Sequence, residues 1–288
     1  MQQVETLIRQ GFFGSFLRKE LYFTQNSVGE HLSQKARQLN GKLLQAKGLD
    51  RLLRTNADEF ARTTCLPVSF AVGINYLLDR KFFSPESLPD QFSLGDLLEL
   101  AVLSHLPGSP TIDTQTGNWY YSFLLDVACR LGLSGRIATE FESSAIFIDE
   151  LKRDKALCLV SLDNQVVPEI TLKRFGVTKM LRVGRHIFLL HGWSENLKSF
   201  LYSDVFNPIP NSDPTLNLWV PPSSLDSYLM TERMPGFSSR ALVLTQRKEQ
   251  DPESKIRNPI LARHPELSLS AFFTWLRQSN LPIKDMPR

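Results

Sequence analysis

Residues 63–71 read TTCLPVSFA, a stretch that places a cysteine directly before a long apolar run. The hydroxyl residues ahead of the cysteine are of the kind that cap helix N-termini. Pro67 is tolerated in a first helical turn, because the N–H that it lacks has no intrahelical partner there. Apolar side chains then recur along one side of the segment. The pattern predicts a helix over 65–80 that begins at or just before Cys65.

A cysteine at the start of a helix is a candidate nucleophile. The N-terminus of a helix carries partial positive charge, which favours the thiolate, and the thiolate is the reactive form. The alternative is a small core residue that happens to begin a helix, since free cysteines are among the most buried side chains. Cys129 and Cys158 lie within apolar runs, and we assign both of them to the core.

Helical patterns precede strand-like patterns along the chain. Helices are expected at 65–80, 93–104, 119–131 and 223–229, and strands at 156–162, 166–175, 186–191, 199–205 and 241–245. This order predicts an α+β fold in which a helical half packs on a mostly antiparallel β-sheet half. We expect a helical N-terminal extension over residues 1–54, the main domain over 55–246, and a polar linker with a C-terminal helix over 247–288.

The composition is that of an ordinary globular protein. The chain has 288 residues, of which 42% are hydrophobic and 10% aromatic, enough to bury a full core. The net charge of +3, from 33 basic and 30 acidic residues, is too small to indicate a nucleic-acid partner. No apolar run approaches the roughly 18 residues of a membrane span, and the N-terminus lacks the pattern of a signal peptide. Three cysteines cannot form a disulfide framework, so we expect a cytoplasmic protein.

A thiolate enzyme needs an imidazole that takes and returns a proton, and a third group that orients the imidazole. His186 begins the strand-like run 186–191, where a side chain can reach the rim of a cleft. His191 lies five positions further on, so in a regular strand it points to the opposite face. We therefore expect only one of the two histidines to face the helix that begins at Cys65. The structural alternative for His186 is a strand-end histidine that hydrogen-bonds the backbone.

Asp204 is the candidate orienting group. It lies 18 positions after His186, a separation that suits neighbouring antiparallel strands joined by a turn around 194–196. Asn207 lies just beyond it and is an alternative orienter. The structural alternative for Asp204 is a turn residue at the end of a strand.

The order of these residues resembles that of papain-like cysteine peptidases, and more narrowly the branch that processes bacteriocin leader peptides. That branch begins its helix with a Cys-Gly-Pro-Ala type sequence, for which this chain has CLPV at 65–68. It also has a His-led strand ending in Gly-Tyr-Asp, matched here by HIFLLHGWS at 186–194, and the similarity covers roughly residues 55–245. The resemblance implies a papain-like fold, a triad of Cys65, His186 and Asp204, and a peptide or protein substrate. The cysteines show no C-x-x-C pairing, and His186 and His191 lie on opposite faces of a regular strand, so we expect no metal or other cofactor.

The sequence departs from that family at two points. The family has a glutamine shortly before the cysteine, whose amide helps to bind the developing oxyanion. This chain has no glutamine between Gln45 and Cys65, which leaves Asn56 as the candidate amide donor, and Leu66 stands in place of the family's glycine. Two other functions therefore stay open: a catalytically inactive module that binds a peptide or protein, and an acyltransferase that uses the same triad. Trp119 is expected to line the cleft or to anchor a buried helix.

Overall fold

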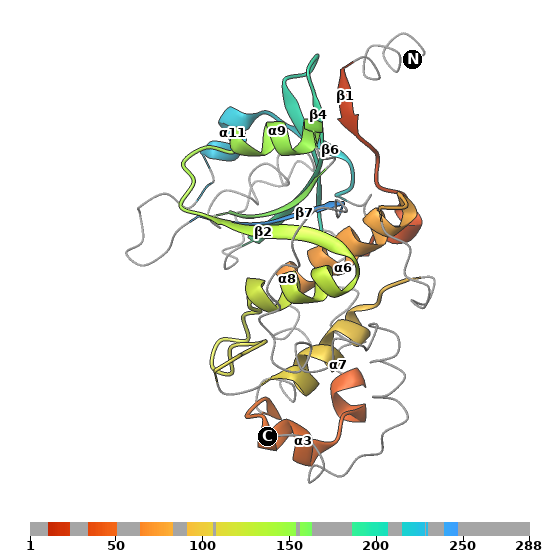
Figure 1. The fold of residues 1–288 in the computed structure, drawn as a ribbon, viewed down its shortest axis with the longest axis vertical. Helices are drawn as coiled ribbons and strands as arrows, with labels where there is room; N and C mark the ends of the chain where they lie inside the picture. Colours follow the sequence, from red (N-terminus) through yellow and green to blue (C-terminus); the bar gives the residue numbers. More distant parts are fainter. Residues whose placement is uncertain are drawn as a thin grey trace, which may run out of the picture.

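One antiparallel sheet organises the part of the chain that the structure describes. The structure is a computed structural model, and it describes residues 11–23, 34–50, 64–82, 91–105, 108–153, 156–162, 186–206, 215–227, 229 and 239–246. In these ranges the strands are β1 (Phe12–Gly14), β2 (Leu133–Thr139), β3 (Leu157–Leu162), β4 (His186–Ser194), β5 (Ser199–Asp204), β6 (Leu218–Val220) and β7 (Arg240–Gln246). Their order across the sheet is β2-β7-β3-β4-β5-β6, and β1 pairs with the end of β4 (Figure 1).

Helices cover both faces of this sheet (Figure 1). The described helices are the short 3-10 turn η1 (Lys19–Leu21), α3 (Gly41–Ala46), α6 (Cys65–Asp79), α7 (Leu94–Ser104), α8 (Tyr121–Arg130), α9 (Ile146–Arg153) and α11 (Pro222–Asp226). Side chains of α6, α7 and α8 share one hydrophobic cluster with alternate residues of the central strands, among them Leu157 and Leu189. Side chains of α9 and α11 share a second cluster with the strand residues that point to the opposite face, such as Cys158 and Phe188. The sheet therefore separates two cores.

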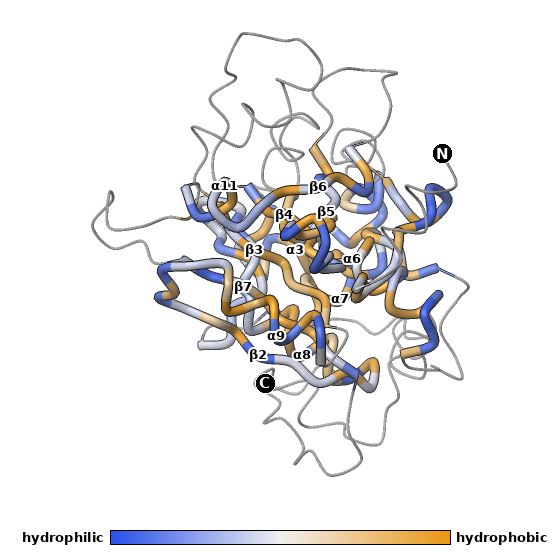
Figure 2. Tube along the Cα trace, turned by 90° about the horizontal axis from the view of Figure 1, so that it is seen from above, coloured by the Kyte–Doolittle hydropathy of each residue, from blue (hydrophilic) through white to orange (hydrophobic). Residues whose placement is uncertain are grey.

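Helix α6 is the centre of the larger core. Every residue from Cys65 to Leu77 is buried, which is typical of a helix that is enclosed on all sides. Gly73 allows its close approach to the sheet, since a Cβ there would lie 2.5 Å from Cδ2 of Leu157 and 3.3 Å from Cδ1 of Leu189. The hydrophobic colouring gathers around the central strands in the middle of the molecule (Figure 2). The position of Cys65 is thus fixed by a helix that packs directly on β3 and β4.

Most of the predicted elements of the main domain are confirmed within a few residues. The helices predicted at 65–80, 93–104 and 119–131 correspond to α6, α7 and α8, and α7 begins with a capping box between Ser93 and Asp96. The predicted strands at 156–162, 186–191, 199–205 and 241–245 correspond to β3, β4, β5 and β7. The α+β class and the mostly antiparallel sheet are therefore confirmed. The predicted strand at 166–175 and the segment 247–288 lie outside the described residues.

The N-terminal segment was predicted to be helical, and this is wrong for residues 12–14. Phe12, Phe13 and Gly14 form β1, which pairs antiparallel with residues 192–194 of β4. The apparent helical spacing runs through Gly11 and Gly14, whose φ angles of 74° and 117° lie outside the helical region. Gly14 also lies against the backbone of β4, where a side chain would clash with the His191 carbonyl. An available strand edge thus overrides the local pattern.

The arrangement of layers differs from the prediction in one respect. A helical half packed on one side of the sheet was expected, but α9 and α11 cover the other face with buried residues such as Phe147, Leu151 and Leu225. The segment 146–153 carries no strong apolar run, so its helix was not predicted. Residues on both sides of the predicted boundary at residue 54, including Leu17, Leu44 and Val68, belong to the same hydrophobic cluster.

Candidate active site

Cys65 is the first residue of α6, as the sequence predicted. The N-cap residue is Thr64, which makes no capping hydrogen bond with its side chain; its carbonyl accepts from the Val68 N–H at 2.9 Å. Pro67 has no N–H group, so the N–H groups in the first turn of the helix are those of Cys65 and Leu66. They give this end of the helix its partial positive charge. The Cys65 side chain lies near the surface of the core with 9% of the residue exposed. The local structure thus supplies the positive helix end that a thiolate needs.

His186 and Asp204 are diagonal neighbours on one face of the β4–β5 pair. Phe188 lies opposite Asp204 in the register, and His186 is two residues before Phe188 on the same face. The Nε2 atom of His186 lies 2.5 Å from Oδ1 of Asp204, and both residues are buried. The strands are antiparallel and joined by the turn at 195–198, as the spacing of 18 residues predicted.

Cys65 meets His186 at the end of the sheet. The two side chains interact, since Cys65 is among the groups that raise the pKa of His186. Because Asp204 occupies Nε2, Nδ1 is the ring nitrogen that is left for the cysteine. The structure therefore brings Cys65, His186 and Asp204 together in the order thiol, imidazole, carboxylate, with elements α6, β4 and β5 contributing one residue each.

The electrostatics of this cluster favour a protonated imidazole. Burial by itself lowers the pKa of His186, but the charge and the hydrogen bond of Asp204, followed by the interactions with Cys65, outweigh burial and raise it. The Phe206 ring packs edge-on against the imidazole at a centroid distance of 5.8 Å, which shields the pair from water on that side. An imidazolium beside a cysteine stabilises a thiolate when one forms.

Three groups that the sequence did not indicate hold Asp204 in place. The Phe206 N–H donates to its Oδ1 at 2.8 Å. The Tyr22 hydroxyl donates to its backbone carbonyl at 2.5 Å, and the Thr215 hydroxyl donates to the same carbonyl. Tyr22 and Thr215 are 182 and 11 positions away from Asp204, and neither stands in a motif that points to it.

His186 and His191 have opposite parity in β4, as the sequence predicted, yet both interact with α6. His191 packs against Tyr76 of α6 with a centroid distance of 5.4 Å, and His186 contacts Cys65 of the same helix. Alternation holds as far as the bulge between Leu190 and Gly192, since Ile187 and Leu189 share the core of α6. His186 has the opposite parity, but as the first residue of β4 it lies where the sheet ends, so its ring can reach the N-terminus of the helix.

His191 belongs to a structural network. Its Nδ1 lies 2.9 Å from the Ser15 carbonyl oxygen and its Nε2 lies 2.9 Å from Oγ of Ser203. Burial lowers the pKa of His191 to about 4, against the smaller effect of the bond to Ser15. The ring is thus neutral near pH 7, with Nδ1–H donating and Nε2 accepting.

The structure bears less on the roles of the other predicted site residues. Trp119 is buried in the same cluster as Cys65 and packs against Phe123, as expected of a helix anchor; a role for it in lining the cleft stays a prediction. Asn56 and Asn207 lie outside the described residues, so their roles as amide donor and alternative orienter also stay predictions. Cys158 is buried in the core as expected, whereas Cys129 is only partly buried.

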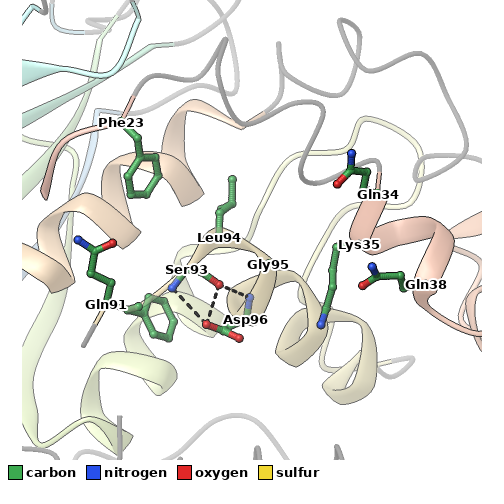
Figure 3. Close-up of a pocket in the computed structure, with 10 residues that line it drawn as sticks. Phe23, Gln34, Lys35, Gln38, Gln91, Ser93, Leu94, Gly95 and Asp96 are labelled. Atoms are coloured by element: carbon green, nitrogen blue, oxygen red, sulfur yellow. Dashed lines mark hydrogen bonds between the residues drawn. The ribbon is translucent and has the colours of Figure 1, made fainter. Parts of the chain in front are cut away.

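A groove of about 480 Å³ lies elsewhere, at the N-terminus of α7 (Figure 3). It is lined by Phe23, Gln34, Lys35, Gln38 and residues 91–96. Ser93 and Asp96 are engaged in the capping box, and Lys35 forms an ion pair with Glu99 at 2.7 Å. The lining offers no thiol and no imidazole, so the chemistry points to Cys65 rather than to this groove.

Neither known proteins nor the described residues assign a family, a metal site or a membrane span to this chain. Neither a scan of protein-family models nor a search of curated proteins finds a match to this chain. In the described ranges, no group of His, Cys, Asp and Glu side chains has a metal-binding arrangement. None of the described helices has both the length and the hydrophobicity required to traverse a membrane. The candidate function therefore rests on the geometry of the site and on the resemblance in residue order.

Proposed function

We propose that this chain is a cysteine hydrolase of papain-like architecture, most simply a peptidase, with Cys65 as nucleophile, His186 as general base and acid, and Asp204 as orienting group. The observation that carries the proposal is that the buried His186 ring contacts Cys65 and Asp204 at once. The α+β layout, with the cysteine at the start of a central helix and the other two residues on adjacent strands, supports the papain-like architecture.

The proposed reaction proceeds through a thioester. The Cys65 sulfur attacks the carbonyl carbon of the scissile peptide bond, and the carbonyl oxygen becomes an oxyanion at the N-terminus of α6. His186 gives its proton to the leaving nitrogen as the C–N bond breaks, which releases the amine. His186 then takes a proton from a water molecule whose oxygen attacks the thioester. The C–S bond breaks, the carboxylic acid leaves, and the thiolate–imidazolium pair is restored.

The second candidate is a binding module of the same architecture without turnover. It is favoured by the depth of the site, because only 9% of Cys65 and 4% of His186 are exposed. Acyl transfer to an amine is a variant of the first proposal, since it shares the thioester and differs only in the group that attacks it.

Turnover of a pool of fluorogenic peptide amides, followed by intact-mass analysis, distinguishes these functions. A hydrolase releases the fluorophore, and the rate falls about 10³-fold or more in Cys65→Ala. Cys129→Ala is the matched control, because it removes another free thiol and is expected to keep the wild-type rate. Products that carry an added amine instead of a new carboxylate would point to acyl transfer. A folded wild-type protein that binds peptides but turns none over would sink the hydrolase proposal.

A further inference from the structure

The N-terminal arm, defined as residues 11–23, contacts all three elements that carry the candidate triad. Its strand β1 pairs with β4. Its Arg18 forms an ion pair with Asp79 of α6, at a distance of 2.9 Å. Its Tyr22 donates to the last residue of β5, Asp204. A segment far from β5 in the sequence thus ends at the backbone carbonyl of the residue whose carboxylate contacts His186.

Between these points the arm is held by polar contacts rather than by packing alone. The Ser15 carbonyl accepts from His191. Leu17 exchanges two hydrogen bonds of 2.8 Å with the side-chain amide of Asn217, one through its N–H and one through its carbonyl. These bonds fix the course of the arm along the sheet. They therefore hold Tyr22 in place independently of its own hydrogen bond to Asp204.

The contact at Asp204 is made with the peptide and not with the carboxylate. The Asp204 carbonyl accepts from the Tyr22 and Thr215 hydroxyls, and its N–H donates to the Thr215 carbonyl at 2.8 Å. The two hydroxyls also lie 3.0 Å apart. Burial raises the pKa of Tyr22, so this hydroxyl keeps its proton and remains a donor. Because the backbone of Asp204 is held on both sides, the direction of its side chain toward His186 is fixed as well.

We propose that Tyr22 is a positioning residue of the candidate site, and that the N-terminal arm acts through it to keep the Asp204 carboxylate aligned with the His186 ring. The inference deepens the proposed function, because it rests on the role given there to Asp204. The Tyr22 hydroxyl donates to the Asp204 carbonyl and lies beside the Thr215 hydroxyl. Its effect must therefore pass through Asp204, and this requirement makes the proposal testable.

The test follows the titration of the His186 ring by NMR in histidine-labelled protein, with the resonance assigned from His186→Gln. The groups that interact with this ring are Cys65 from α6 and Asp204 from β5. In the wild type the ring is expected to titrate above the ordinary histidine range, because Asp204 and Cys65 raise its pKa. Asp204→Asn lowers the midpoint, and Tyr22→Phe is expected to lower it by about one pH unit. The double variant is expected to titrate like Asp204→Asn alone, because the phenol acts through the carboxylate.

Tyr76→Phe is the matched control. The Tyr76 hydroxyl accepts from Oγ of Ser15 and donates to the His191 carbonyl, so it also joins the arm to the sheet, but it does not touch Asp204. It is expected to leave the His186 midpoint unchanged even if it lowers the melting temperature as much as Tyr22→Phe. Thr215→Val removes the other hydroxyl from the Asp204 carbonyl and is expected to move the midpoint in the same direction as Tyr22→Phe.

A wild-type midpoint in both Tyr22→Phe and Thr215→Val would overturn the proposal, and so would additive shifts in the double variant. The result is separable from that of the proposed function. An inactive wild type in which Tyr22 still shifts the His186 midpoint removes the hydrolase and keeps the positioning role. An active wild type without this coupling removes only the positioning role.

Discussion

Asp204→Asn is the substitution that most sharply separates a functional carboxylate from a structural one. The side chain is buried, and its Oδ1 receives hydrogen bonds from His186 at 2.5 Å and from the Phe206 N–H at 2.8 Å. Asparagine keeps the shape and one acceptor oxygen, so the bond from Phe206 can survive. The bond from the imidazolium loses the attraction between opposite charges and is weakened, because an amide is neutral. A hydrogen bond to a charged group contributes about 1.5–3 kcal/mol, so we expect a loss of about 2–3 kcal/mol in the free energy of unfolding near pH 6.

The pH dependence gives this prediction its direction. The fold raises the pKa of His186 from 6.5 to about 10. A raised pKa means that folding favours the protonated ring, so the contribution to stability is complete below pH 6.5 and is lost as the pH rises toward about 10. The difference between the wild type and Asp204→Asn should therefore shrink over this window. Urea unfolding at a series of pH values from 5.5 to 10 measures it.

Asp226→Asn is the control for this experiment. Asp226 also accepts two hydrogen bonds, from Oγ of Ser143 at 2.8 Å and from the Ser144 N–H at 2.6 Å, but it lies on α11 and does not contact His186. It should lower stability without changing the slope between pH 6.5 and 10. A pH-independent loss in Asp204→Asn, equal to that in the control, would refute the account of the His186–Asp204 pair.

Three further predictions concern the scaffold. Gly73→Ala should destabilise the fold by about 1–3 kcal/mol, because its Cβ would lie 2.5 Å from Leu157. Gly95→Ala, whose Cβ would have no neighbour closer than 3.6 Å, should stabilise α7 by about 0.5–1 kcal/mol. Thermal unfolding compares the two variants. Burial lowers the pKa of His191 to about 4, so its contribution to stability is complete above pH 6.5 and is lost as the pH falls toward 4; acid unfolding should show a slope that His191→Gln flattens. Asn217→Gly keeps the left-handed backbone at φ 57° but removes both bonds to Leu17, so the Leu17 amide should exchange with solvent at least tenfold faster, which hydrogen-exchange NMR detects.

The sequence predicted the candidate site better than its surroundings. Cys65 was placed by a helix start signal, and His186 and Asp204 by strand patterns on either side of a turn, all of which are local. Their meeting is consistent with the order of elements, because a central helix and two adjacent strands leave few ways to pack. What the sequence could not provide is the contact itself, since His186 reaches Cys65 only because it is the first residue of its strand.

The contacts behind the site depend on long-range geometry and were therefore not predictable. Tyr22 is joined to Asp204 across 182 positions by a single hydroxyl, and no local pattern marks such a pair. The β1 strand was read as helix because Phe12 and Phe16 have helical spacing, whereas its pairing with β4 depends on an edge that exists only in the folded sheet. Helix α9 was missed because its segment, IFIDELKR, is short and only Phe147 and Leu151, one turn apart, are buried.

The most direct test of the central claim is the rate at which iodoacetamide alkylates Cys65 at pH 6, followed by peptide mass mapping. If His186 and Cys65 form a reactive pair, Cys65 in the wild type should react at least 100-fold faster than Cys129 in the same molecule, and His186→Gln should remove this advantage. Equal rates at Cys65 in the wild type and in a folded His186→Gln variant would contradict the claim.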